Sequence, residues 1–163
     1  MNRKLALVSV VLVVLLICVS LSTLVYWYGW PKAGKEYARV EFSPLIIDGI
    51  EFNCEVADAP AEWTAGLSGR EELGLGAGML FVWPTPSQQT FWMKNTLIPL
   101  DIVFVWANGT VGAIYQAPIE PGVPESDLTR YESPGPVKWV VELNLGTCAA
   151  IGIVVGSQLS IRY

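Results

Sequence analysis

The chain has no histidine among its 163 residues. This absence excludes histidine-based catalytic triads, histidine metal ligands and histidine pH switches. Basic residues are scarce as well, with 10 Lys and Arg against 15 Asp and Glu, so the formal net charge is −5. Binding to nucleic acid needs a basic surface that displaces counterions from phosphates, so the composition argues against a nucleic-acid partner.

Cysteine is also rare, because the chain has three and none has CxxC or metal-ligand spacing. With no histidine and no cofactor fingerprint, we expect neither a metal nor a cofactor. Cys54 and Cys148 leave two interpretations open. They could form a disulfide, which persists outside the cytoplasm, or they could be two buried free thiols.

Charge is absent from Leu5 to Val25, a stretch of 21 residues dominated by Leu and Val. As a helix, this stretch is long enough to cross a bilayer core of about 30 Å. Arg3 and Lys4 precede it, and the positive-inside rule then places the N-terminus in the cytoplasm. Residues 1–30 are therefore predicted to be a signal anchor, and the chain a single-pass cell-membrane protein whose C-terminal domain is extracytoplasmic.

A cleaved signal peptide is the alternative interpretation of this stretch. Signal peptides have an apolar region of about 7–15 residues, followed by small residues at the cleavage site. Here the aromatic residues Tyr26, Trp27, Tyr28 and Trp30 stand where small residues would be needed. Aromatic rings are typical of the membrane–water interface, so we favour a retained anchor.

Residues 31–39 are polar, contain Pro and Gly, and are predicted to be a linker to one domain at residues 40–163. Two β-hairpins are expected in this domain, at Asp48-Gly49 and at Asn108-Gly109. Such pairs favour the positive φ angles of a two-residue turn. From Ile50 to Val56 apolar and polar residues alternate, which indicates a half-buried strand.

Many short strands separated by Gly- and Pro-rich turns predict a mainly β, small sandwich- or barrel-like domain with one or two short helices. Helices are expected at residues 60–73 and 147–151, the second capped by Thr147. Residues 116–136 hold five prolines and should form a long exposed loop. Further strands are expected at residues 79–83, 90–93, 101–106, 110–115, 138–144 and 158–163.

Several blocks occur in a distinctive order: G-L-x-x-R from Gly66, GMLF from Gly78, FWMKNT-x-x-PLD from Phe91 and ELN-x-G from Glu142. Together they closely resemble the bacterial and archaeal family called domain of unknown function 192. The resemblance covers about residues 50–161. It implies a compact, mainly β, sandwich-like domain that commonly follows a signal peptide or membrane anchor, and it implies no established reaction. Ser68 and Ser157 depart from the usual Met and Asp of the family.

Two charged residues interrupt apolar segments. Lys94 follows Phe91, Trp92 and Met93 directly, and Glu142 lies within the segment Val140–Leu143. A buried carboxylate without a cationic partner is costly, so pairing is the least costly arrangement. We therefore expect Lys94 and Glu142 to be neighbours on adjacent strands, at the edge of the main pocket.

Arg70, Asn95 and Asp101 complete this candidate polar pocket. It could hold a small anionic or carbonyl ligand. Two structural alternatives remain, in which the charges form an ion pair between strands or Glu142 points to solvent. Four tryptophans are expected to pack in the core or on the sheet rather than to contact a ligand: Trp83, Trp92, Trp106 and Trp139.

Three classes of function remain open. The first and favoured class is a membrane-tethered binding or interaction module, because no nucleophile or cofactor motif is present. The second is an enzyme that uses Lys94 with Glu142 or Asp101. The third is a structural partner in the cell envelope. A concave pocket containing Lys94 would favour the first two classes, and a flat apolar patch would favour the third. The sequence identifies no protein partner.

Overall fold

The computed structural model describes residues 42–161. The predicted anchor at residues 1–30 and the predicted linker at residues 31–39 lie outside this range. None of the helices within residues 42–161 has the length and apolar character needed to span a membrane.

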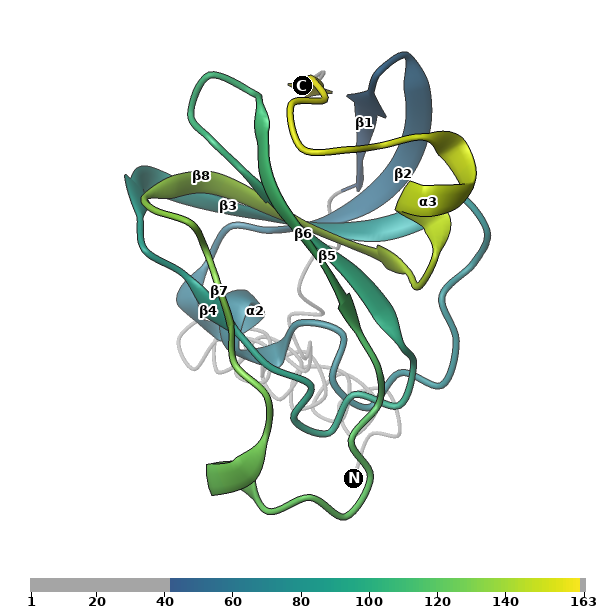
Figure 1. The fold of residues 1–163 in the computed structure, drawn as a ribbon, viewed down its shortest axis with the longest axis vertical. Coiled ribbons are helices and arrows are strands. Elements are labelled where there is room, and N and C mark those ends of the chain that lie inside the picture. Colours follow the sequence, from purple (N-terminus) through teal and green to yellow (C-terminus); the bar gives the residue numbers. More distant parts are fainter. Residues whose placement is uncertain (1–41, 162–163) are drawn as a thin grey trace, which may run out of the picture. The chain divides into compact units, whose positions relative to one another are not determined.

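The domain is mainly β, as predicted, and is built on one seven-stranded sheet (Figure 1). The order of its strands is β6-β5-β8-β3-β2-β1-β9, and only β2 and β3 run parallel. A second sheet pairs β4 with β7. The strands are β1 Phe42–Ile47, β2 Ile50–Ala57, β3 Ala77–Ser87, β4 Thr90–Phe91, β5 Leu100–Val105, β6 Val111–Ala117, β7 Tyr131–Glu132, β8 Val137–Asn144 and β9 Leu159–Ile161. The helices are α2 Pro60–Ala65, the 3-10 helix η1 Glu125–Asp127 and α3 Thr147–Ile151.

The seven-stranded sheet curls into a half-barrel, because its two edge strands meet at one end. The N–H of Val111 at the start of β6 donates to the carbonyl of Ser157 at 2.8 Å. The N–H of Leu159 in β9 donates to the carbonyl of Gly109 at 2.7 Å.

Side chains alternate between the two faces of the sheet and form two separate cores. On one face an aromatic cluster includes Phe81, Trp83 and Phe104, and side chains of α2, β4 and β7 pack on it. On the other face an aliphatic cluster includes Leu80 and Val141. Side chains from α3 and β9 complete the aliphatic cluster. Strand alternation therefore places every second residue of β8 under the layer formed by α2, β4 and β7.

The two predicted hairpin turns differ in form. At Asp48-Gly49 both residues have positive φ, 48° and 85°, and Ile47 pairs with Ile50, so the two-residue turn is confirmed. At Asn108-Gly109 the predicted hairpin is confirmed, because β5 and β6 pair antiparallel, but the predicted two-residue turn is wrong. Here β5 and β6 are joined by a longer loop, in which the Asn108 side-chain oxygen accepts the N–H of Thr110 at 3.0 Å. Only the glycine of this pair has positive φ, so the two-residue geometry does not form.

One helix is shorter than predicted, and one loop is more ordered than predicted. The helix expected at residues 60–73 ends at Ala65, because Gly66 has a φ of 47° that no helix continues. The helix at 147–151 is confirmed, but Gly146 rather than Thr147 is its N-cap. The loop at residues 116–136 is not wholly exposed, since it contains η1 and β7 and buries Leu128 and Ser133.

Cys54 and Cys148 are both buried in the aliphatic cluster, and both are free. The disulfide alternative is therefore wrong. Burial raises the pKa of each thiol to about 12, so both remain protonated at neutral pH. They pack as small apolar side chains.

Candidate functional site

An open pocket of about 480 Å³ lies above the aromatic cluster. This volume is within the range of small-molecule sites, which is about 300–1,000 Å³. Helix α2, strand β4 and the turn after β4 form its sides, and strands β3 and β8 contribute to its floor. The aromatic residues that line it are Trp63, Phe81, Trp83, Phe91 and Trp92. The uncharged polar residues that line it are Thr64, Ser68, Gln89, Thr90, Asn95 and Thr96.

The aromatic rings of the pocket pack against one another in a continuous wall. Trp63 and Trp83 stack with centroids 5.8 Å apart, and Phe81 stacks on Trp83 at 6.2 Å. Phe91 meets Phe81 edge-on at 4.9 Å. The Trp63 indole N–H donates to the carbonyl of Ala57 at 3.0 Å. This bond ties the indole ring of Trp63, in α2, to the end of strand β2. The rings of the wall therefore support one another by packing and, at Trp63, by a hydrogen bond to the backbone.

Glu142 lies at the floor of this pocket, in the middle of the sheet. Its cross-strand neighbours are Met79 on β3 and Ile102 on β5, both apolar. The residue is 5% exposed, and its Oε2 atom has no hydrogen-bond partner among the described residues. Burial raises the pKa of the Glu142 carboxyl to about 8, because the charged form loses its hydration.

Lys94 lies at the rim of the same pocket but does not pair with Glu142. Its Nζ atom contacts the carboxylate of Glu125 in η1 at 2.6 Å. The prediction of a Lys94–Glu142 ion pair on adjacent strands is therefore wrong. Strand β4 ends at Phe91, so Lys94 belongs to the following turn and its exposed side chain reaches the loop instead. Within the pocket lining, Lys94 and Glu142 are the two residues with ionisable side chains.

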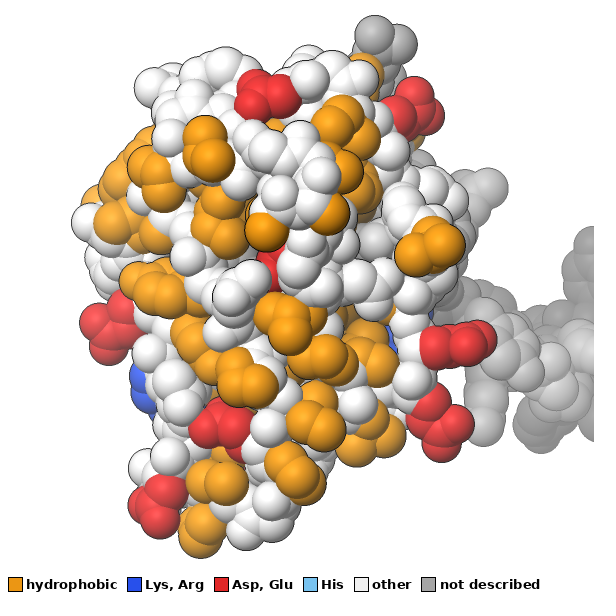
Figure 2. All heavy atoms as spheres, turned by 45° about the vertical axis from the view of Figure 1, so that its right-hand side comes forward, with side chains coloured by type: hydrophobic (Ala, Val, Ile, Leu, Met, Phe, Trp, Pro, Cys, Tyr) orange, Lys and Arg blue, Asp and Glu red, His pale blue; other side chains and the backbone are white. Residues whose placement is uncertain are grey.

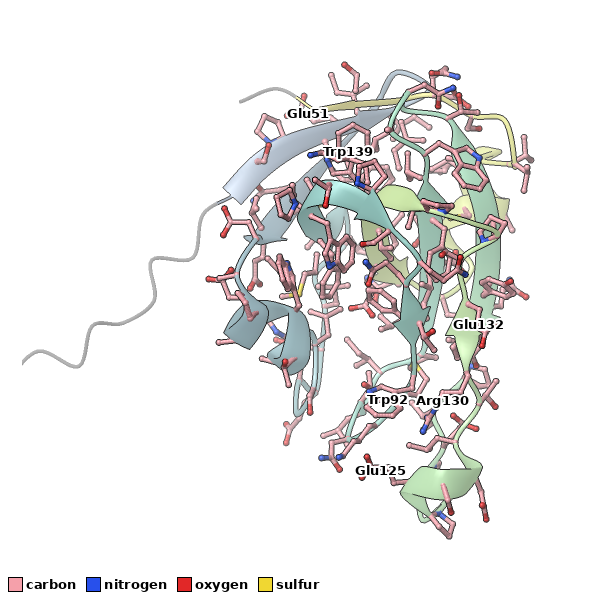
Figure 3. The ribbon with its side chains drawn as sticks, turned by 90° about the vertical axis from the view of Figure 1, so that its left-hand side faces the viewer. Glu51, Trp92, Glu125, Arg130, Glu132 and Trp139 are labelled. Atoms are coloured by element: carbon pink, nitrogen blue, oxygen red, sulfur yellow. The ribbon has the colours of Figure 1, made fainter. Side chains whose placement is uncertain are left out.

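A second cation lies next to the rim, against Trp92, without lining the pocket itself. The guanidinium of Arg130 lies 3.9 Å from the ring centroid of Trp92, and Figure 3 shows the two side by side. Arg130 also donates to the carbonyl of Glu125 at 3.0 Å, while the Glu125 carboxylate binds Lys94. Loop residues 125–130 are thus linked to the rim by an ion pair and a cation–π contact.

Asn95 is confirmed as part of the pocket lining, in a backbone conformation that few residues adopt. Its φ is 53°, and asparagine tolerates this left-handed region better than most residues. The Asn95 carbonyl accepts the N–H of Gly69 at 2.8 Å. This bond joins the turn after β4 to the segment after α2, so both sides of the pocket are tied together.

Arg70 and Asp101 do not line the pocket, which corrects the predicted set. Arg70 forms a two-bond ion pair with Glu55 of β2. Asp101 is 0% exposed and faces α3, where its carboxylate accepts the N–H of Gly146 at 3.0 Å and of Cys148 at 2.8 Å. Asp101 therefore satisfies the free donors at the start of α3 and has a structural role.

The aromatic wall is not among the site residues that the sequence predicts. Trp83 and Trp92, expected to pack in the core or on the sheet, line the pocket as well as packing. Trp63 and Phe91 also line the pocket, and neither is in the predicted set. The available signal was the recurrence of aromatic residues immediately before Lys94 and in the first turn of α2.

Two solved structures are similar to this chain. A protein of unknown function from Novosphingobium aromaticivorans DSM 12444 is 35% identical, with a TM-score of 0.67 over 81% of this chain and 94% of the other. A candidate transcription regulator from Sinorhizobium meliloti 1021 is 28% identical, with a TM-score of 0.67 over 75% of this chain and 95% of the other. No curated protein matches the chain.

The family match agrees with the resemblance seen in the sequence. Residues 45–161 match the family DUF192, described as uncharacterized ACR. This range includes both sheets except the first three residues of β1, and it includes the whole pocket. The chain therefore belongs to the domain of unknown function 192 family.

Proposed function

We propose that the domain is a binding module for a small organic molecule held in the pocket above Glu142. One observation carries this proposal: Glu142, whose buried Oε2 atom has no hydrogen-bond partner among the described residues, lines an open pocket together with five aromatic residues. A buried polar group is normally satisfied within the protein. An unsatisfied one at the floor of an accessible pocket is suited to a ligand that supplies the missing partner.

The pocket supports binding over the structural alternative. A concave site that includes Lys94 was the feature expected of a binding or catalytic domain, and this site has it. The enzyme alternative paired Lys94 with Glu142 or Asp101. It is less well supported, because Lys94 is bound by Glu125 and Asp101 caps α3.

Transcriptional regulation, suggested by the description of the S. meliloti protein, is not favoured for this chain. Its 15 acidic residues outnumber its 10 basic ones. Figure 2 shows acidic side chains at several places on one face and few basic ones. Such a surface repels the phosphate backbone of nucleic acids.

The proposal includes a membrane location. The uncharged stretch Leu5–Val25, preceded by Arg3 and Lys4, supports an anchor that leaves the binding domain outside the cytoplasm. A tethered binding module would act on small molecules of the extracytoplasmic space.

The test is a thermal-shift screen of the full-length protein against a library of small molecules. Ligands should raise the melting temperature by mass action in the wild type and in a Glu51→Gln control, whose exposed carboxyl is on β2 outside the pocket (Figure 3). The shift should be lost in Glu142→Gln and in Ser68→Trp, which fills the pocket mouth. A library without hits, or hits unaffected by both pocket variants, would overturn the proposal.

A further inference from the structure

We propose that the ligand is an organic cation, with an ammonium group that lies beside the Glu142 carboxylate and against the aromatic wall. This inference rests on the binding function proposed above and names the chemical class of its ligand. Two features support it: the counter-charge missing at Glu142, since Glu125 binds Lys94, and the aromatic lining of the pocket.

The floor of the pocket lacks a positive charge to balance an ionised Glu142. Met79 and Ile102 flank Glu142 across the sheet, and neither can neutralise or hydrogen-bond a carboxylate. Lys94 is the one cationic side chain in the pocket lining, and Glu125 already binds it at 2.6 Å. An ionised Glu142 therefore lacks a counter-charge within the described part of the chain. A ligand ammonium would provide both the charge and a hydrogen-bond donor or close contact.

The lining of the pocket is rich in aromatic rings. Aromatic rings carry negative potential on their faces and attract cations, with Trp the strongest of them. Five aromatic residues line this one pocket, and three of them are tryptophans: Trp63, Phe81, Trp83, Phe91 and Trp92. A neutral apolar ligand would be equally served by aliphatic residues, which here are concentrated on the opposite face of the sheet.

At the rim of the pocket, side chains of the protein itself already form cation–π contacts. Trp92 is 42% exposed and still holds Arg130 at 3.9 Å, with Lys94 at 5.7 Å from the same ring centroid. Trp92 thus already attracts two cations of the protein at the solvent boundary. A ligand cation against the accessible parts of the aromatic wall would be attracted in the same way, and more strongly where the pocket excludes water.

Binding of a cation should release a proton. At neutral pH the Glu142 carboxyl is mainly protonated, because burial raises its pKa to about 8. A ligand ammonium favours the ionised form, so the proton leaves for solvent as the cation enters. Affinity should therefore rise with pH, by up to about tenfold per unit below pH 8. A neutral ligand that accepts a hydrogen bond from the protonated carboxyl would show the reverse dependence.

The experiment compares choline with its uncharged carbon analogue, in which a tert-butyl group replaces the trimethylammonium group, and butylammonium with butanol. Binding to the full-length protein is measured by calorimetry at about pH 6 and about pH 9. We expect at least one ammonium compound to bind, more than tenfold more tightly at the higher pH. The neutral analogues should bind at least tenfold more weakly. Binding should be unchanged in Glu51→Gln and reduced more than tenfold in Glu142→Gln.

The outcomes separate the ligand class from the binding function. Equal binding of the neutral analogues, or an affinity that falls as the pH rises, would show that the ligand is not an organic cation. The pocket would remain a binding site. Ammonium binding that survives in both Glu142→Gln and Ser68→Trp would place the cation elsewhere and overturn this inference. If neither ammonium compound binds while other library compounds do, the inference of an organic cation is wrong and the proposed binding function stands. If no compound binds at all, the proposed function falls with it.

Discussion

At the scale of single residues, burial of the unpaired Glu142 carboxyl costs stability, and the same carboxyl is suited to the proposed ligand. Its carboxyl is buried among apolar neighbours, and it has no cation from the protein to offset its loss of hydration. Natural proteins tolerate such groups mainly where a site requires them. The protonation of this one residue should therefore be visible in the stability of the domain.

Stability should fall as the pH rises from about 4.5 to about 8, because burial raises the Glu142 pKa to about 8 in the folded state. Within this window the folded protein keeps a proton that the unfolded chain has lost. The free energy of unfolding therefore decreases with pH, by at most about 1.4 kcal/mol per unit, and levels off above the window. Urea unfolding of the wild type at a series of pH values measures this slope.

The Glu142→Gln variant is the matched control for that slope, because its amide does not titrate. Its stability should lack the Glu142 contribution, so the difference between variant and wild type should move in favour of the variant as the pH rises. Glu51→Gln changes an exposed carboxyl on the same sheet and should leave the wild-type slope intact. Parallel pH profiles for wild type and Glu142→Gln would contradict a raised pKa at this position.

At the scale of single elements, α3 depends on a side chain from the sheet. Asp101 accepts the N–H of Gly146 and of Cys148, and it comes from β5, 45 residues before Gly146. Asp101→Ala should leave these donors without an acceptor in a buried place and cost about 1–3 kcal/mol of unfolding free energy. Asp101→Asn keeps one oxygen acceptor and should cost less. Urea denaturation of both variants tests whether Asp101→Ala costs more than Asp101→Asn. An Asp101→Ala variant with the unfolding free energy of the wild type would refute the capping role.

The contact between β3 and β8 leaves no room for a side chain at Gly78. A Cβ atom there would lie 2.7 Å from the Glu142 carbonyl oxygen and 3.0 Å from the Cys54 sulfur. Because the carbonyl is part of the sheet, Gly78→Ala should cost about 1–3 kcal/mol. In the control Gly74→Ala, the new atom would meet only the Ala77 Cβ at 3.8 Å, an ordinary contact. Similar melting temperatures for these two variants would be inconsistent with this packing.

At the scale of the whole molecule, the proposed anchor predicts where the domain lies in the cell. If residues 5–25 anchor the chain as proposed, the full-length protein should sediment with membranes and resist extraction at high salt. Protease added to intact cells, with the outer membrane permeabilised where there is one, should remove the domain and spare a short N-terminal fragment. Recovery of the full-length chain in the soluble fraction would contradict the anchor.

The local sequence was sufficient to predict most strands and one helix. Alternation of apolar and polar residues marked β2, and the Asp48-Gly49 pair marked its turn, because both depend on neighbouring residues alone. The helix at Thr147–Ile151 was predicted for the same reason. The exceptional character of Glu142 was also visible, since a charge inside an apolar strand is unusual in any fold.

Tertiary structure decided which residues meet. Lys94 binds Glu125 rather than Glu142, because β4 ends early and a loop distant in the sequence passes the rim. Asp101 faces α3 and not the pocket, because strand alternation puts it on the opposite face from Glu142. Trp63 joins the wall because α2 packs on the sheet. These contacts depend on the curl of the sheet and the path of the loops, whereas sequence patterns report only the preferences of neighbouring residues.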